Sequence, residues 1–77
     1  MVEMKLTVNG QAREVPEGTT VAQLLQQLGV VPERVVVELN LTILKRAEHP
    51  NALLKEGDEV EIVQFVGGGG HAPTRSG

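Results

Sequence analysis

Residues 4–29 read MKLTVNGQAREVPEGTTVAQLLQQLG, and the first half of this stretch has the pattern of a β-hairpin. Apolar residues alternate with polar ones from residue 4 to residue 8, the period of a strand with one buried face. Asn9-Gly10 follows at once, and both residues tolerate the positive φ angles of a two-residue hairpin turn. We therefore predict a return strand that runs to about Val15 and ends at Pro16.

The second half of the stretch has the pattern of an amphipathic helix. Thr19 or Thr20 can cap its first turn, and Gln23 is placed for a capping box if Thr20 is the cap. Gly29 supplies a left-handed stop at the other end. The apolar stripe at i, i+3, i+4 and i+7 consists of Val21, Leu24, Leu25 and Leu28.

Further strands are predicted in the second half of the chain. Residues 34–39 (RVVVEL) form a β-branched strand, and residues 42–45 (TILK) can form a short fourth one. Residues 46–54 lack a clean period, so we expect a loop with at most one helical turn there, because Pro50 breaks a helix.

A turn centred on Gly57 leads into the last strand, and no pattern continues beyond Val66. The resulting order contains one amphipathic helix, which needs one face of one sheet to cover it. We predict an α+β fold, a β-grasp in which a mixed sheet of four to five strands packs on one main helix. Residues 1–66 form this domain, and residues 67–77 form a flexible, glycine-rich tail.

Composition excludes several classes of function. The net charge of −3 and the pI near 5.2 argue against nucleic-acid or anionic-membrane partners. The chain has no cysteine, which excludes disulfides and thiolate zinc sites and fits a cytoplasmic location. No signal peptide or membrane-spanning run is visible. His49 and His71 are expected in exposed loops, so we predict no metal site.

Apolar residues also occupy the face of the last strands that should point to solvent. Val63 and Phe65 fall on the same side as the glutamates of the last strand, and Val36 shares a side with Glu38. If these strands are neighbours, Val36, Val63 and Phe65, followed by Val66, form an exposed docking patch. The alternative, equally supported by the residues, is a β-bulge that resets the alternation and buries Phe65.

Four glycines, Gly67 to Gly70, follow this patch. Glycine has no Cβ, so such a segment can enter a narrow slot in a partner and leaves a terminal carbonyl unhindered. An ATP-dependent enzyme can convert that carboxylate to an acyl-adenylate, from which a sulfur nucleophile displaces AMP. The alternative is an inert linker.

The chain resembles the ThiS family of sulfur carriers, which have a ubiquitin-like β-grasp fold, from about Met4 to Gly69. The segments that carry the resemblance are VNGQAREVPEGTTVAQLLQQLG (8–29), VVVELN (35–40) and LKEGDEVEIVQFVGGG (54–69). The resemblance implies a protein cosubstrate of thiamin biosynthesis and not an enzyme.

In such a carrier a C-terminal glycine, here Gly69 or Gly70, is adenylated by an E1-like enzyme and becomes a thiocarboxylate. Thiazole synthase then takes the sulfur for the thiazole ring. Gly67 and Gly68 would be the part of the tail inside the partner, with the docking patch close by. No cofactor is bound by the carrier, and the ATP is used by the activating enzyme.

The sequence departs from the family at several positions. The family often has Asn-Gly at Asn40-Leu41, Pro-Arg at Lys45-Arg46, and a tryptophan at His49. More seriously, HAPTRSG follows Gly70, and an internal glycine carbonyl cannot be adenylated. A processing protease, a cloning remnant or a loss of the chemistry would each account for these residues.

Two other functions stay open at this point. One is a sulfur carrier for molybdopterin or cysteine synthesis, and the other is a non-catalytic β-grasp interaction module. An acidic set could meet a basic surface on an adenylating enzyme, although such runs are more often solvated turns; it consists of Glu56, Asp58, Glu59 and Glu61.

Overall fold

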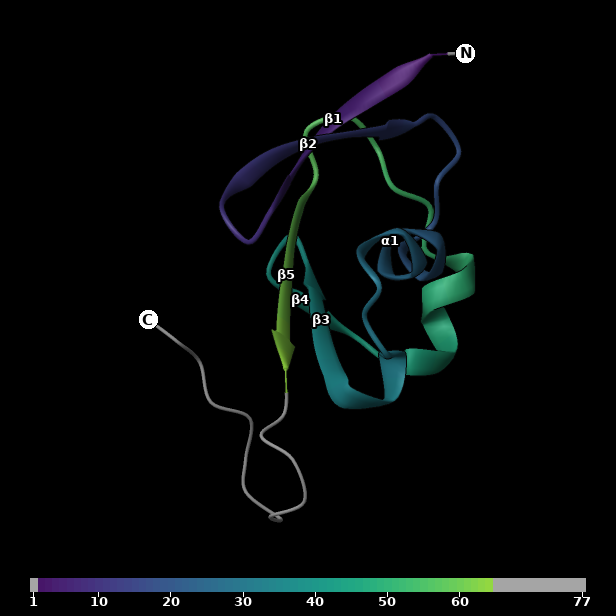
Figure 1. The fold of residues 1–77 in the computed structure, drawn as a ribbon, viewed down its shortest axis with the longest axis vertical. Coiled ribbons are helices and arrows are strands. Elements are labelled where there is room, and N and C mark those ends of the chain that lie inside the picture. Colours follow the sequence, from purple (N-terminus) through teal and green to yellow (C-terminus); the bar gives the residue numbers. More distant parts are fainter. Residues whose placement is uncertain (1, 65–77) are drawn as a thin grey trace.

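The computed structural model describes residues 2–64, and its chain begins with the predicted hairpin (Figure 1). Strand β1 (Glu3–Val8) pairs antiparallel with β2 (Gln11–Pro16). Between them Asn9 and Gly10 have φ angles of 49° and 82°, as a two-residue turn with left-handed residues requires. The hairpin is therefore confirmed.

Helix α1 (Val21–Leu28) begins and ends at the predicted residues. The Thr20 side chain accepts a hydrogen bond from the Gln23 amide at 3.2 Å, and the Gln23 side chain accepts one from the Thr20 amide at 2.9 Å. Gly29 closes the helix in the left-handed conformation, with φ of 72°. The capping box and the glycine stop thus set the length of the helix.

Between residues 30 and 64, the chain forms two short 3₁₀ helices and three strands. In chain order these are η1 (Pro32–Arg34), β3 (Val35–Leu39), β4 (Thr42–Leu44), η2 (Arg46–Asn51) and β5 (Glu59–Gln64). The expected short fourth strand is present. The expected loop is instead a 3₁₀ helix with Pro50 inside it, which a 3₁₀ segment accommodates because it uses fewer backbone donors than an α-helix.

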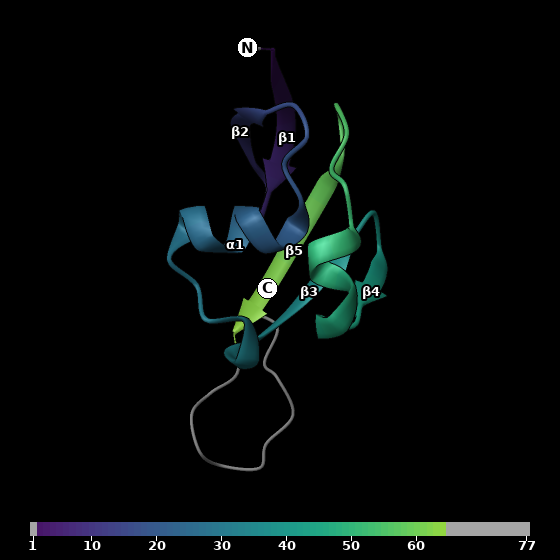
Figure 2. The ribbon, with the colours of Figure 1, turned by 90° about the vertical axis from the view of Figure 1, so that its right-hand side faces the viewer.

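The sheet has the strand order β2-β1-β5-β3-β4, with β1 and β5 parallel and the other pairs antiparallel. Figure 1 shows α1 and η2 on one side of β5 and β3, and Figure 2 shows α1 lying across β5. The predicted β-grasp, a mixed sheet around one main helix, is confirmed. None of the helices in residues 2–64 is long and apolar enough to cross a membrane.

The core lies between α1 and the sheet. Its buried apolar residues are Met4, Leu6, Val8, Val15, Val21, Leu24, Leu25, Val35, Val37, Leu54 and Val60. The segment after η2 pairs with the start of the helix, because the Val21 amide donates to Ala52 and the Leu54 amide donates to Thr19, at 2.9 and 3.0 Å. These bonds fasten α1 to the segment that leads into β5.

Candidate functional site

Strand β5 is the central strand of the sheet, and the glycine run follows it in the chain. It pairs with β1 only at Thr7↔Glu59 and Val8↔Val60, but with β3 from Val60 to Gln64. The strand that carries the predicted reactive tail is thus held on both sides.

The structure places the two described members of the predicted docking patch next to each other. Val36 and Val63 are direct partners in the β3–β5 ladder, and both are half-buried. The ladder runs without an extra residue up to Val35↔Gln64, so no bulge occurs in this part of β5. Phe65 and Val66 lie outside the described residues, and the docking role stays a prediction.

Two carboxylates and an isoleucine form the next row of the same face. Glu38 and Glu61 are ladder partners, and Glu38 also faces Ile43 of β4. Glu38 is only 7% exposed, whereas Ile43 is 62% exposed. The face around Val36 and Val63 is therefore mixed, with apolar and acidic groups side by side.

Half of the predicted acidic set has a structural role. The Glu56 side chain accepts a hydrogen bond from the Lys5 amide at 3.0 Å. The Asp58 side chain accepts bonds from the Lys55 amide at 2.8 Å and from the Asn40 amide group at 3.0 Å. These two residues hold the turn before β5, and the side chains of Glu59 and Glu61 are exposed.

The expectation that His49 lies in an exposed loop is wrong. His49 is 3% exposed within η2, and its Nε2 atom has no hydrogen-bond partner in the described chain. Burial, and to a smaller extent the charge of Arg46, hold the pKa of His49 below its usual 6.5. The described residues contain no group of three or more side chains able to hold a metal ion. His71 lies outside them.

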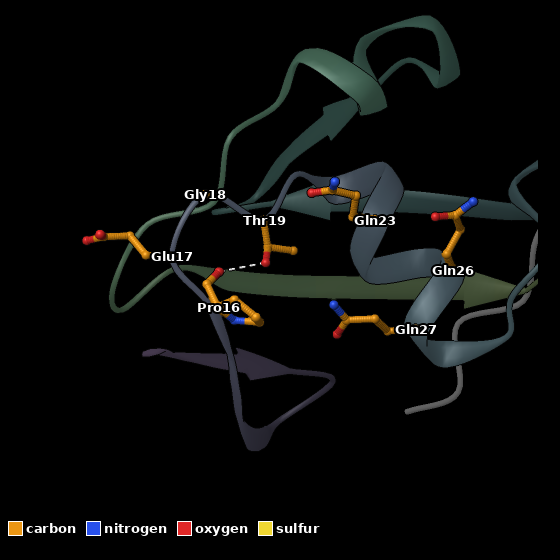
Figure 3. A pocket seen from close by; sticks show the side chains of 7 residues that line it. All are labelled: Pro16, Glu17, Gly18, Thr19, Gln23, Gln26 and Gln27. Carbon is orange, nitrogen blue, oxygen red and sulfur yellow. Dashed lines mark hydrogen bonds between the residues drawn. The ribbon is translucent and has the colours of Figure 1, made fainter. Parts of the chain in front are cut away.

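A shallow polar hollow of about 510 Å³ lies beside the start of α1 (Figure 3). Gln23, Gln26 and Gln27 of α1 line it, together with residues 16–19. The Thr19 hydroxyl donates to the Pro16 carbonyl at 2.6 Å and so fixes the turn at its edge. The lining offers amides and one carboxylate but no nucleophile paired with a base, so it does not form a catalytic site.

The predicted reactive glycines, Gly67 to Gly70, lie outside the described residues. What the described chain defines is a small β-grasp domain whose central strand leads toward a glycine-rich segment. The ThiS family model matches residues 6–69, and the chain belongs to the ThiS family.

Individual relatives agree with this membership. The sulfur carrier protein ThiS of Thermus thermophilus is 37% identical over 62 residues, which cover 80% of this chain and 95% of that protein. The crystal structure of ThiS from Geobacter metallireducens superposes with a TM-score of 0.75 at 43% identity, covering 86% of this chain and 100% of that one.

A second kind of relative is much longer. A thiazole synthase of Magnetococcus marinus is 41% identical over 73 residues, which cover 95% of this chain but 22% of that protein. The chain thus spans about a fifth of the length of the curated thiazole synthases it matches.

Proposed function

We propose that the chain is a sulfur carrier of thiamin biosynthesis. After removal of the residues that follow, the carboxylate of Gly69 or Gly70 is adenylated with ATP by an E1-like enzyme, which releases pyrophosphate. A sulfur nucleophile then attacks the acyl carbon and displaces AMP, leaving a thiocarboxylate. Thiazole synthase is the proposed acceptor of the sulfur, and the carrier itself has no catalytic role.

One observation carries this proposal: the family match begins within β1, continues through the rest of the sheet and includes the glycines up to Gly69. The fold alone would support an interaction module as well. The inclusion of these glycines in the matched range favours the carrier, because the proposed chemistry needs an unhindered terminal carbonyl, which glycine provides. It also favours Gly69 over Gly70 as the reactive terminus.

The longer relatives support thiazole synthase as the partner. In these proteins a segment similar to this chain and the remainder of a thiazole synthase belong to one polypeptide. The match to the Magnetococcus marinus protein leaves out only 5% of this chain, so it extends beyond Gly70. Residues after the glycine run therefore have counterparts in at least one relative.

We place the docking surface for these partners on the face that carries Val36 and Val63. This face lies opposite the one that α1 covers, since Val37 and Val60 of the same strands are in the core. It adjoins the end of β5, where the tail begins. Phe65 and Val66 are proposed to extend it.

Intact mass spectrometry tests the proposal directly. The full chain and variants that end at Gly69, Gly70 or Gly68 are incubated with ATP, the adenylating enzyme of the same genome and sulfide. The variant ending at Gly69 is expected to gain the mass difference between oxygen and sulfur, and the full chain is expected to stay unchanged. The variant ending at Gly68 is the control for tail length.

Two outcomes would contradict the proposal. If none of the truncated variants reacts, the chain is not a substrate of that enzyme, and an interaction module becomes the better interpretation. If the thiocarboxylate forms but thiazole synthase does not consume it, the carrier serves another sulfur pathway.

A further inference from the structure

Both hairpin turns of the sheet begin with an asparagine in the left-handed conformation, and both asparagines bond to β5. Asn9 has φ of 49° and Asn40 has φ of 51°. Asn40 lies on the β3 side, where its backbone amide donates to the Glu59 carbonyl at 2.8 Å and its side-chain oxygen accepts from the Glu59 amide at 2.9 Å. These bonds fix the first residue of β5.

Asn9 lies on the opposite side of β5 and acts further along the strand. Its backbone amide donates to the Val60 carbonyl at 2.9 Å. Its side-chain oxygen accepts from the Ile62 amide at 2.7 Å, and its side-chain nitrogen donates to the Ile62 carbonyl at 3.3 Å. The side-chain amide therefore takes the place that a backbone peptide would have in the ladder.

The bonds from the Asn9 side chain matter because β1 ends too early to pair with the second half of β5. The parallel ladder stops at Val8↔Val60, and the chain turns away at Asn9 and Gly10. The Asn9 side chain extends the contact with β5 to Ile62, two residues before Gln64. It thus holds the strand on its β1 side, close to the point where the tail begins.

We infer that Asn9 is a positioning residue for the delivery of the C-terminal glycine into a partner's reaction site. The inference rests on the proposed carrier function. A tail delivers its terminus reproducibly only if the strand from which it starts has a fixed position, since small misplacements of a reacting group slow a reaction strongly. Docking depends instead on Val36 and Val63, which the β3–β5 ladder holds independently.

The inference predicts a specific kinetic effect for Asn9→Gly. Glycine adopts the same φ but lacks the side-chain amide, so the turn is retained and both bonds to Ile62 are lost. In chains ending at Gly69, we expect the kcat of adenylation to fall about three- to tenfold with little change in KM. Asn9→Asp keeps an acceptor for the Ile62 amide and is expected to restore most of kcat.

Amide hydrogen exchange supplies an independent readout. The acceptor for the Ile62 amide is the Asn9 side chain, so this amide should exchange about tenfold faster or more in Asn9→Gly than in the parent. Ala22→Gly, in α1, is the matched control: it destabilises the whole domain and leaves the bonds to Ile62 intact. It should change neither kcat nor the exchange of Ile62 relative to neighbouring amides.

The outcomes separate this inference from the proposed function. Faster exchange at Ile62 with kcat unchanged would overturn the positioning role, and so would an equal loss of kcat in Ala22→Gly. Unchanged exchange at Ile62 would also overturn it. Failure of the unsubstituted chains ending at Gly69 and at Gly70 to react at all would instead overturn the carrier function.

Discussion

Replacing Leu41 by glycine should stabilise the domain, because Leu41 occupies a backbone conformation that suits glycine. Its φ is 71° in the turn between β3 and β4, and Leu39 and Thr42 on either side are ladder partners. The left-handed conformation costs an L-residue roughly 1–2 kcal/mol. The same turn geometry occurs at Asn9-Gly10, where the second residue is glycine and has φ of 82°.

The expected net increase in the free energy of unfolding is smaller than the backbone strain that is relieved. Glycine raises the conformational entropy of the unfolded chain, which lowers the free energy of unfolding by about 0.4–1 kcal/mol. The Leu41 side chain is 83% exposed, so its removal forfeits little apolar burial. We therefore expect Leu41→Gly to raise the free energy of unfolding by about 0.5–1 kcal/mol, which corresponds to roughly 2–8 °C in Tm for a domain of this size.

Urea unfolding of the full chain, followed by far-UV circular dichroism, measures this difference, and the m-value should stay unchanged. Leu41→Ala is the matched control, because alanine keeps the Cβ and the strain; we expect it within about 0.5 kcal/mol of the parent. The reciprocal change, Gly10→Ala, should cost about 1 kcal/mol. A Cβ at Gly10 would meet no atom within 4 Å, so this cost reflects backbone conformation alone.

The reasoning would be refuted if Leu41→Gly and Leu41→Ala destabilised the domain equally. That result would mean that the leucine side chain contributes packing energy that its exposure does not suggest. It would also be refuted if Gly10→Ala had no effect, since the two turns share one geometry.

Three further predictions concern other parts of the molecule. The pKa of His49 is lowered in the folded state, so the unfolded chain binds the proton more tightly and the free energy of unfolding should fall as the pH drops below about 6.5. Urea unfolding at pH 7.5 and 5.5 tests this: the parent should lose more stability between the two pH values than His49→Gln does. Thr20→Ala removes the helix cap and should cost about 1 kcal/mol, measured as a lower urea midpoint. Val63→Glu places a third carboxylate beside Glu38 and Glu61 and should raise the KM for the adenylating enzyme about tenfold. Its charge-matched control is Thr42→Glu, at an exposed position of β4, which should leave KM within about twofold of the parent value.

Local sequence patterns were enough to predict the elements that are formed by interactions between residues close in the sequence. The hairpin at Asn9-Gly10 and the helix between Thr20 and Gly29 depend on residues within four positions of one another. Alternation in the strands also indicated that Val63 faces away from the core, and the regular β3–β5 ladder agrees with it. The turn, capping and alternation patterns each involve residues close in the sequence, so they can be recognised without the structure.

The contacts that hold β5 could not be predicted in this way. Asn9 and Ile62 are 53 positions apart, and an Asn-Gly pair predicts a turn without showing what the asparagine side chain bonds to. The burial of His49 was missed because residues 46–54 lack a hydrophobic period. The tryptophan common at this position in the family was the signal that favoured burial over exposure.

The length of the tail restricts where a partner can bind. Gly69 is the fifth residue after Gln64, and five extended residues span at most about 18 Å. The reaction site of any partner must therefore lie within that distance of the end of β5 when the carrier is docked. A surface around Val36 and Val63 satisfies this condition, because Val63 directly precedes Gln64 and Val36 is its ladder partner. The short reach is also why the position of β5 matters: a tail of this length cannot compensate for a strand whose end moves.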